Sequence, residues 1–590
     1  MVVVSAAVRS VLWEADDHGR MNPSRSFITV ASLAIAASTA VPVAAPAGTA
    51  VAGTAVAATA AAGTAPKIEW KACRAFSEAA LKQMFAAGQI AEFKALWART
   101  ECGTVSVPLD YGAPSGRKIS IAVTRLKATD QARRLGSLAL NPGGPGGSGY
   151  LMPVTYVMLH RNGNGEKLNQ RYDLIGFDPR GVGYSTKVDC PDPGQAPDPG
   201  PSPITKVEAK QVYDRTVKAN QACGNHDPAF LRQLTTANVA RDLDQIRQGL
   251  RQRTLSFLGI SWGTWLGAIY RSLFPASVQR MWLDSTAIPE FRLDTFEAGR
   301  AKATDRNFSR LAAWMAERNA TYGFGSTAAQ VERSLARMRV AFNAHPKTFT
   351  DLPDWVFDGV FIALASSTTS RDWPLAAAVL RELRQAQSGA NAPPLIKKAF
   401  SPPPGDGGTP PSDLPEEFNP TMHQAVFCNE DTGPRDFDSA WAAYQKRLRR
   451  YPVTGEASGF INNCAGWPHP AQAVKLRRNN ASLVMSGHRY EVPSPYEWTR
   501  QMQASIGGSV LTVGDDIHGS TAGEDTDCAP RIAAYFFTGR PDNGRCQGVP
   551  LPTSTEVPPL TVTDLARSLA QHTSKQNPYA SNAPTRGVHS

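Results

Sequence analysis

The chain has 590 residues and a formal net charge of +11, with 42% hydrophobic and 19% charged residues. This balance is typical of a globular protein and allows roughly two or three ordinary domains, or one large domain with an insertion. Lysine and arginine are scattered and form no basic run interleaved with aromatic residues, so a nucleic-acid partner is not expected.

The N-terminal segment predicts export. Arg20 and Arg25 precede SFITVASLAIAASTAVPVAAPAGTA, in which a short apolar run is followed by small residues with A-x-A-like sites. This is the pattern of a general secretory signal peptide. We therefore assign residues 1–66 to a signal peptide and a low-complexity pro-segment, and expect a secreted, extracellular protein. No later apolar run is long enough to span a bilayer, so no membrane partner is expected.

The eight cysteines agree with export. An even number of cysteines in a secreted chain predicts disulfides, although sequence alone leaves their connectivity undetermined. They fall into four couples that are close in sequence: Cys73 with Cys102, Cys190 with Cys223, Cys428 with Cys464, and Cys528 with Cys546. A zinc site is the alternative, but no C-x-x-C pair occurs. We expect disulfides and no bound metal.

The order of apolar segments predicts an α/β architecture. In residues 67–288, TVSVPLDY and KISIAVTRLKA alternate as antiparallel strands do, and later apolar runs are separated by helical segments. This pattern indicates a mostly parallel sheet with helices on both faces. Residues 289–480 are mainly helical and are interpreted as a cap insertion. The sheet resumes in residues 481–548, and residues 549–590 are a C-terminal extension that is expected to be partly disordered.

The segment LSFLGISWGTWLGAIY contains a candidate nucleophile. Gly259, Ser261 and Gly263 fit the G-x-S-x-G pattern in its required context, with an apolar strand before and a helix after. The glycines are needed because a tight turn from strand to helix leaves no room for a Cβ at these positions. Ser261 would then be exposed at a helix N-terminus, which favours negative charge nearby. The alternative is an ordinary turn serine.

A serine nucleophile needs a base and an acid that orients the base. His518 ends the late strand SVLTVGDDI and is the candidate base, with His488, after ASLVM, as its competitor. The acid is expected just past ASLVMSG, where Glu491 is the only carboxylate. Asp515 and Asp516 lie too near His518 in sequence to fold back onto its far nitrogen, and we expect one of them to bind the loop backbone.

The glycine-rich turn NPGGPGGSG follows a buried strand and could supply backbone N–H groups to an oxyanion. The amide of Trp262 would supply a second donor. A phosphate-binding loop is the alternative, but no G-K-[ST] follows. In the segment DPRG, Asp178 and Arg180 are expected to pair with each other and brace the loop below the site.

Several motifs together resemble those of the secreted tripeptidyl aminopeptidases of actinomycetes, which are α/β-hydrolase-fold serine exopeptidases related to proline iminopeptidases. They are NPGGPGGSG, FDPRGVGYS, GISWGT, FCNED, LVMSGHRYEVPSPYEW, DDIHGS and CAPRIAAYFFTGRPDNGRC, and the similarity extends over nearly all of Ile68 to Cys546. The resemblance implies the α/β-hydrolase fold with a helical cap. It implies Ser261 as nucleophile, His518 as base, oxyanion donors at Gly147 and Trp262, and no cofactor.

One departure concerns the acid. The family has Asp-Pro after the seventh strand, whereas GHRYEVPSP places Tyr490 or Glu491 there. We choose Glu491, because glutamate reaches about one methylene further than aspartate and can make the same contact.

The resemblance also implies that carboxylates of the cap hold the α-amino group of the substrate. Glu430 and Asp431, beside Cys428, are the candidates, and their alternative is a role as surface acids. The expected function is release of short peptides, usually tripeptides, from peptides with a free N-terminus, by a monomer. Because fold does not determine substrate, the alternatives are an esterase or amidase acting on a small metabolite, and an inactive hydrolase-fold binding protein.

Overall fold

A ten-stranded sheet is the largest sheet in the computed structural model, which describes residues 66–159, 164–191, 203–400, 411 and 413–557. The expected signal peptide and nearly all of the pro-segment lie outside the described residues, as does the end of the C-terminal extension. The strand order is β1-β2-β3-β5-β4-β6-β7-β10-β11-β12. The strands are β1 (Ile68–Lys71), β2 (Thr100–Pro108), β3 (Lys118–Leu126), β4 (Gly136–Asn141), β5 (Tyr172–Phe177), β6 (Leu255–Ile260), β7 (Val278–Asp284), β10 (Leu483–His488), β11 (Ser509–Val513) and β12 (Arg545–Cys546).

The sheet is antiparallel at one edge and parallel elsewhere, as the sequence predicts. The β1–β2, β2–β3 and β3–β5 pairs are antiparallel. Every pair from β5 to β12 is parallel. Because parallel strands all end at the same edge, the residues that follow β4, β6, β7, β10 and β11 meet there.

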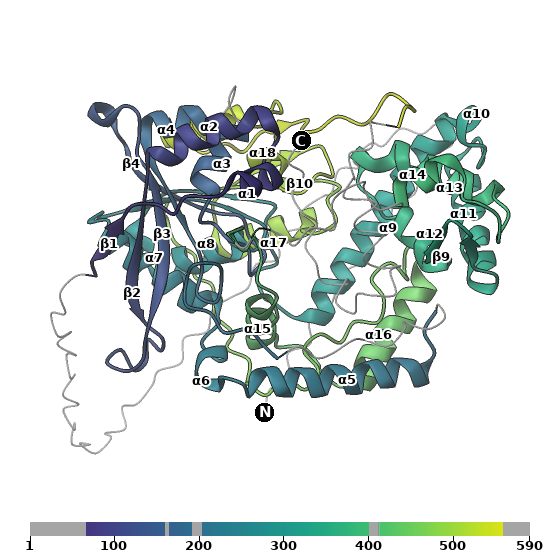
Figure 1. Cartoon of the computed structure of the whole chain (residues 1–590), viewed down its shortest axis with the longest axis horizontal. Coiled ribbons are helices and arrows are strands. Elements are labelled where there is room, and N and C mark those ends of the chain that lie inside the picture. Colours follow the sequence, from purple (N-terminus) through teal and green to yellow (C-terminus); the bar gives the residue numbers. More distant parts are fainter. Residues whose placement is uncertain (1–65, 160–163, 192–202, 401–410, 412, 558–590) are drawn as a thin grey trace, which may run out of the picture. The chain divides into compact units, whose positions relative to one another are not determined.

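Helices cover both faces of this sheet (Figure 1). Ile121 and Val123 of β3 pack into a core with helices of one face, and Ala122 between them packs into the core of the other face. This follows from the alternation of side chains along a strand. The first face carries α7 (Thr236–Gly249), α8 (Trp262–Leu273) and α17 (Tyr496–Ile506), and the second carries α2 (Ala87–Ala98), α3 (Met152–Leu159), α4 (Asn164–Arg171) and α19 (Pro530–Thr538).

The segment between β7 and β10 is mainly helical, and part of it has a hydrophobic core of its own, centred on residues such as Leu311, Trp373 and Phe361. It also contains an antiparallel pair of strands, β8 (Lys347–Phe349) and β9 (Leu352–Phe357), that the sequence pattern did not predict. The helices are α9 (Leu293–Glu317), α10 (Asn319–Tyr322), α11 (Ala328–Ala344), α12 (Gly359–Ala365), α13 (Trp373–Gln385), α14 (Pro394–Phe400), α15 (Pro420–Glu430) and α16 (Phe437–Arg450). Shorter or peripheral helices elsewhere are α1 (Glu78–Met84), α5 (Lys206–Gly224), α6 (Pro228–Leu231) and α18 (Ser520–Gly523).

The four predicted disulfides are confirmed, and each joins two cysteines that are close in sequence: Cys73–Cys102, Cys190–Cys223, Cys428–Cys464 and Cys528–Cys546.

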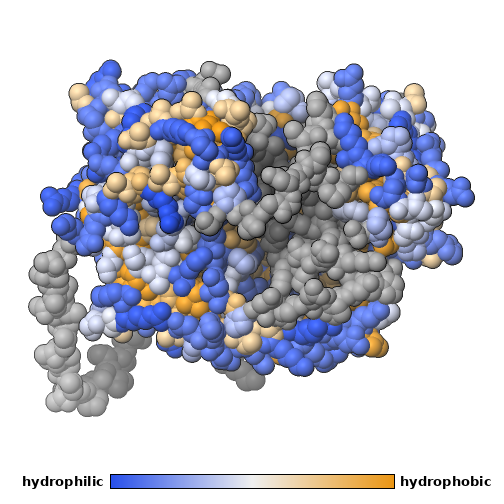
Figure 2. Space-filling model, in the orientation of Figure 1, coloured by the Kyte–Doolittle hydropathy of each residue, from blue (hydrophilic) through white to orange (hydrophobic). Residues whose placement is uncertain are grey.

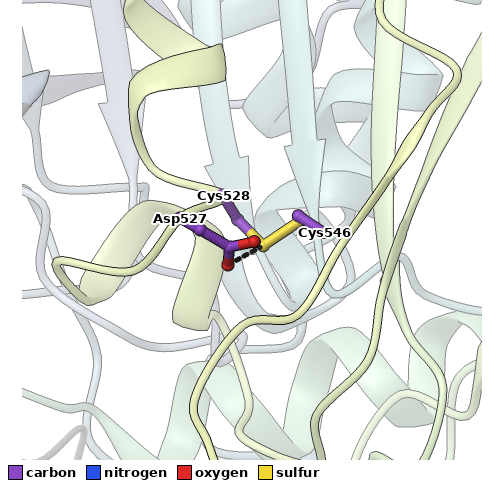
Figure 3. A group of neighbouring side chains, drawn as sticks. All are labelled: Asp527, Cys528 and Cys546. Carbon is purple, nitrogen blue, oxygen red and sulfur yellow. Dashed lines mark hydrogen bonds between the residues drawn. A yellow bond between two sulfur atoms is a disulfide. The ribbon is translucent and has the colours of Figure 1, made fainter.

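The disulfide Cys528–Cys546 lies beside the carboxylate of Asp527 (Figure 3). The two sulfurs are bound to each other, and the Asp527 oxygens accept hydrogen bonds from the backbone N–H groups of Gln547 and Gly548, both at 2.9 Å. We therefore interpret this group as a braced loop and not as a metal site.

The surface drawn in Figure 2 is mainly hydrophilic, with hydrophobic residues in separate patches. The large hydrophobic side chains exposed among the described residues are Val207, Val340 and Leu551. Within the same part of the chain, no helix combines the length and the apolar character that crossing a bilayer requires.

Candidate active site

Ser261 occupies the sharp turn between β6 and α8. Its φ of 58° is unusual for a residue with a side chain, and its N–H donates to the carbonyl of Asp284 at 3.0 Å. The flanking glycines are sterically required, because a Cβ on Gly259 would lie 2.4 Å from the carbonyl oxygen of Gly263. No hydrogen bond engages the Ser261 hydroxyl within the described residues, and the side chain lines a pocket. The turn therefore holds a free hydroxyl at a helix N-terminus.

His518 and Glu491 come together as the sequence predicts. His518 follows β11, and its Nδ1 forms a short hydrogen bond with Oε1 of Glu491, which follows β10. Glu491 is fully buried, whereas the His518 side chain is 26% exposed. Gly519, which follows His518, packs against Ile260, which precedes Ser261. A Cβ on Gly519 would lie 2.9 Å from Cγ2 of Ile260. The base and the hydroxyl of Ser261 are thus brought to the same edge of the sheet.

Ser285, directly after β7, is a site residue that no sequence motif indicated. Its hydroxyl donates to Oε2 of Glu491 at 2.9 Å and accepts from the N–H of Gly519 at 2.8 Å. It therefore links the acid to the residue after the base. Its φ of 56° lies in the left-handed region, a conformation that nothing in the sequence revealed. The only available signal was its position at the end of a buried strand.

The expectation that Gly147 is an oxyanion donor is wrong for this structure. The Gly147 N–H donates to the carbonyl of Gly143 at 3.2 Å, because the turn closes on itself. The N–H of Gly144 has no hydrogen-bond partner among the described residues, and Gly144 lines the same pocket as Ser261 and Trp262. Gly144 and Trp262 both line this pocket, and their N–H groups are the candidate oxyanion donors.

The start of α15 holds the glycine turn in place. The N–H of Asn419 donates to the carbonyl of Gly146 at 2.9 Å, and a Cβ on Gly146 would lie 2.5 Å from the Asn419 carbonyl. His423 donates from Nδ1 to the carbonyl of Pro145 at 2.9 Å. Burial lowers the pKa of His423 to about 4, so the ring is neutral near pH 7 and donates as the Nδ1–H tautomer.

The pocket at Ser261 is lined mainly by apolar side chains and contains one carboxylate. Its volume is about 50 Å³, and Glu430 at the end of α15 contributes to its wall. The two oxygens of Glu430 accept from the N–H of Thr236 at 2.5 Å and from Nε1 of Trp265 at 2.8 Å. Burial raises the pKa of Glu430. Aromatic and aliphatic side chains complete the lining: Trp262, Ile288, Phe291, Phe296, Val426 and Phe427.

Asp431, expected to act with Glu430, does not line this pocket. Its Oδ1 accepts from the N–H groups of Leu293 and Gly433, both at 2.9 Å, and Arg435 lies 3.6 Å from Oδ2. Successive residues at the end of a helix point in different directions, so only one of the two carboxylates faces the pocket. Asp431 instead fixes the start of α9.

The expected pair of Asp178 and Arg180 is also wrong. Arg180 makes two hydrogen bonds of 2.7 Å to the carboxylate of Asp242 in α7, a geometry that suits the planar guanidinium. Asp178 accepts from the hydroxyl of Ser148 at 2.5 Å and from the N–H of Tyr184 at 2.8 Å. Burial raises the pKa of Asp178 to about 6.

His488, the competing base, is fully buried between Asp284 and Asp515 and has no surface for a substrate. The expectation that Asp515 or Asp516 binds the backbone of its own loop is wrong, because both carboxylates bind backbone N–H groups of distant segments. Asp515 accepts from the N–H of Val549 at 2.8 Å, and Asp516 accepts from the N–H of Ser370 at 2.8 Å.

A serine on a strand-to-helix elbow, with a histidine and a buried acid after later parallel strands, is typical of a serine hydrolase of the α/β-hydrolase fold. Comparison with known proteins agrees. Residues 137–373 match a family model described as alpha/beta hydrolase fold, and residues 451–549 match one described as TAP-like protein. The predicted fold class is thereby confirmed.

Curated relatives identify the family. The tripeptidyl aminopeptidase of Streptomyces lividans is 30% identical over 461 residues, which cover 75% of this chain and 82% of that protein. Carboxylesterase B of Mycobacterium tuberculosis is 28% identical over 539 residues, 86% of this chain and 95% of that protein. Serine protease Hip1 of the same organism is 35% identical over 225 residues, 36% and 41% of the two chains. The chain belongs to the tripeptidyl aminopeptidase family and is a serine hydrolase.

Proposed function

We propose that this protein is a secreted serine exopeptidase that releases short peptides, tripeptides in particular, from peptides with a free N-terminus. In this proposal Ser261 is the nucleophile, His518 the general base and Glu491 the acid that orients it. The contact between His518 and buried Glu491 supports the last two roles. The four disulfides support an oxidising, extracellular location, and we expect the enzyme to act as a monomer.

The proposed reaction has two stages. Nε2 of His518 takes the proton of the Ser261 hydroxyl, and the serine oxygen attacks the scissile carbonyl carbon. The N–H groups of Gly144 and Trp262 stabilise the oxyanion, and the imidazolium of His518 protonates the departing amine. Water then attacks the acyl-enzyme by the same proton transfers in reverse and releases the N-terminal peptide. Glu491 keeps its charge throughout and stabilises the imidazolium.

The observation that carries the exopeptidase function is the buried carboxylate of Glu430 in the pocket of Ser261. A buried carboxylate is unfavourable unless it is hydrogen-bonded or paired with a cation. Thr236 and Trp265 supply two neutral donors, and the α-ammonium group of a peptide would supply the missing positive charge. Binding of that group next to the nucleophile would limit cleavage to positions near the N-terminus.

The test uses di-, tri- and tetrapeptide anilides in free and N-acetylated form, with the mature enzyme. We expect hydrolysis of the free tripeptide and a loss of about 100-fold or more in kcat/KM on acetylation, the scale of a buried charge pair. Glu430→Gln should raise KM for free peptides and leave hydrolysis of p-nitrophenyl acetate unchanged, since that ester has no amine. Ser261→Ala should abolish both reactions.

Carboxylesterase activity is the second candidate, because a relative named carboxylesterase B aligns over 86% of this chain. An esterase would hydrolyse acetylated and free substrates alike, and Glu430→Gln would then have no selective effect. Equal kcat/KM for free and acetylated tripeptide anilides would refute the exopeptidase proposal in favour of this alternative.

A further inference from the structure

A second charged cluster, formed by Asp284, His488 and Asp515, lies at the ends of the strands that carry the proposed catalytic residues. All three side chains are fully buried. Nε2 of His488 lies 2.9 Å from Oδ1 of Asp284, and Nδ1 lies 2.6 Å from Oδ1 of Asp515. The members come from the ends of β7 and β10 and from the loop after β11. These are the three segments that carry Ser285, Glu491 and His518.

The remaining carboxylate positions of the cluster are also hydrogen-bonded, so it is a built structure. Asp284 accepts from the Ser486 hydroxyl at 2.5 Å and the Ala522 N–H at 2.9 Å, and Asp515 accepts from the Ser520 hydroxyl at 2.6 Å and the Val549 N–H at 2.8 Å. Buried polar networks rigidify a structure when every member is satisfied.

The contacts require that His488 be charged. Both ring nitrogens face carboxylate oxygens, and an imidazole can donate from both only as imidazolium. Burial opposes this charge, but the charges and hydrogen bonds of Asp284 and Asp515 outweigh it and hold the pKa of His488 well above its ordinary value. The cluster therefore carries a net charge of −1. Two further titratable groups interact electrostatically with the cluster: Tyr156 of α3 with Asp284, and Arg310 of α9 with Asp515. Arg310 also lies 3.5 Å from Oδ2 of Asp516.

Each member of the cluster is close in sequence to a proposed catalytic residue or to a residue that contacts one. Asp284 directly precedes Ser285, whose hydroxyl donates a hydrogen bond to Glu491. The N–H of Glu491 donates to the carbonyl of His488 at 3.3 Å. Asp515 lies three residues before His518 in the same loop.

We propose that Asp284, His488 and Asp515 form a buried ionic triad that positions the catalytic acid and base and sets the electrostatic potential at the base. They are positioning residues, because none of them touches the substrate. The inference rests on the proposed roles of His518 and Glu491. It implies that the triad affects the chemical step more than substrate binding, since misplacement of a catalytic group by about 1 Å can cost about 100-fold in rate.

The experiment compares Asp284→Asn, Asp515→Asn and the double variant His488→Gln/Asp515→Asn in the full mature chain. Each single variant removes one negative charge, whereas the double variant restores the net charge of −1. We expect kcat to fall about 10- to 100-fold in all three, with KM within about 3-fold of the unaltered enzyme. The two single variants should also shift the acid limb of the kcat/KM profile to lower pH, because the protonated base loses a nearby negative charge. In the double variant the acid limb should return to its original position.

Asp242→Asn is the matched control. Asp242 is as deeply buried and is paired with Arg180, but it contacts none of the proposed catalytic residues. It should lower the midpoint of urea unfolding without moving kcat or the acid limb. If the triad variants behave as Asp242→Asn does, the triad is only structural and the proposal is overturned.

Ser520→Ala covers the case in which the charged variants do not fold. It removes one donor to Asp515 without a change of charge, so we expect kcat to fall about 3- to 10-fold with the acid limb unchanged. An unaltered kcat would contradict the proposal.

Labelling of the unaltered enzyme by a fluorophosphonate distinguishes failure of the proposed function from failure of the triad proposal. Failure to label Ser261 would refute the proposed function, whereas labelling together with unchanged triad variants would refute the triad alone.

Discussion

Ser285→Ala tests whether the position of Glu491, the proposed acid, depends on the hydroxyl of Ser285, which directly follows β7. The substitution removes the donor to Oε2 of Glu491 and the acceptor for the N–H of Gly519, which are 2.9 and 2.8 Å from the hydroxyl. A hydrogen bond to a charged group contributes about 1.5 to 3 kcal/mol, and a neutral one about 1 kcal/mol. We expect the free energy of unfolding to fall by about 3 kcal/mol. Because Glu491 would lose one of its fixed contacts, kcat should fall about 10- to 100-fold.

Ser285→Gly is the matched control for backbone strain. It loses the same two hydrogen bonds, but glycine adopts the left-handed conformation of this residue without the cost of a Cβ. It should therefore be about 1 kcal/mol more stable than Ser285→Ala and equally impaired in kcat. Urea unfolding and initial rates on a peptide anilide measure the two effects. A Ser285→Ala enzyme with unaltered kcat would refute the role of Ser285 in positioning Glu491. Equal stability of the two variants would refute backbone strain at this residue.

Three further predictions concern the surrounding structure. Glu491→Asp withdraws the carboxylate by about 1.5 Å and should lower kcat about 100-fold, as measured by initial rates. The double variant Cys428→Ser/Cys464→Ser opens a loop with a sequence separation of 36 and should lower the free energy of unfolding by about 4 kcal/mol in urea. The buried His423, with its pKa lowered to about 4, resists protonation while the unfolded chain takes up a proton near pH 6.5. Stability should therefore fall as the pH drops from about 6.5 to about 4, and His423→Gln should weaken this dependence in urea unfolding.

Much of the site was predictable because its residues follow segments with a strong local signature. A buried strand followed by G-x-S-x-G located Ser261, and the ends of two later strands located His518 and Glu491. The disulfide couples were suggested by the spacing of the cysteines along a chain that the sequence predicts to be exported. For the three site residues the necessary information lies within a few residues of sequence, and parallel strands then bring their ends to one edge.

The errors arose where a role depends on the direction of a group. Gly144 and Gly147 belong to the same glycine turn, and only the folded turn shows which N–H is free. Glu430 and Asp431 are neighbours of the same charge, yet only Glu430 faces the pocket. Arg180 pairs with Asp242, which is 62 positions away, instead of with its neighbour Asp178.

The sequence by itself determined the α/β-hydrolase architecture and three residues at one edge of the sheet, because alternation, glycine sterics and the succession of strands and helices are local properties. Only the tertiary structure decided the disulfide connectivity, which carboxylate lines the pocket of the nucleophile, and the contacts of Ser285 and of Asp284, His488 and Asp515. Hydrogen bonds and ion pairs depend on distances between atoms of remote segments. Those distances exist only once the strands have paired and the side chains have packed.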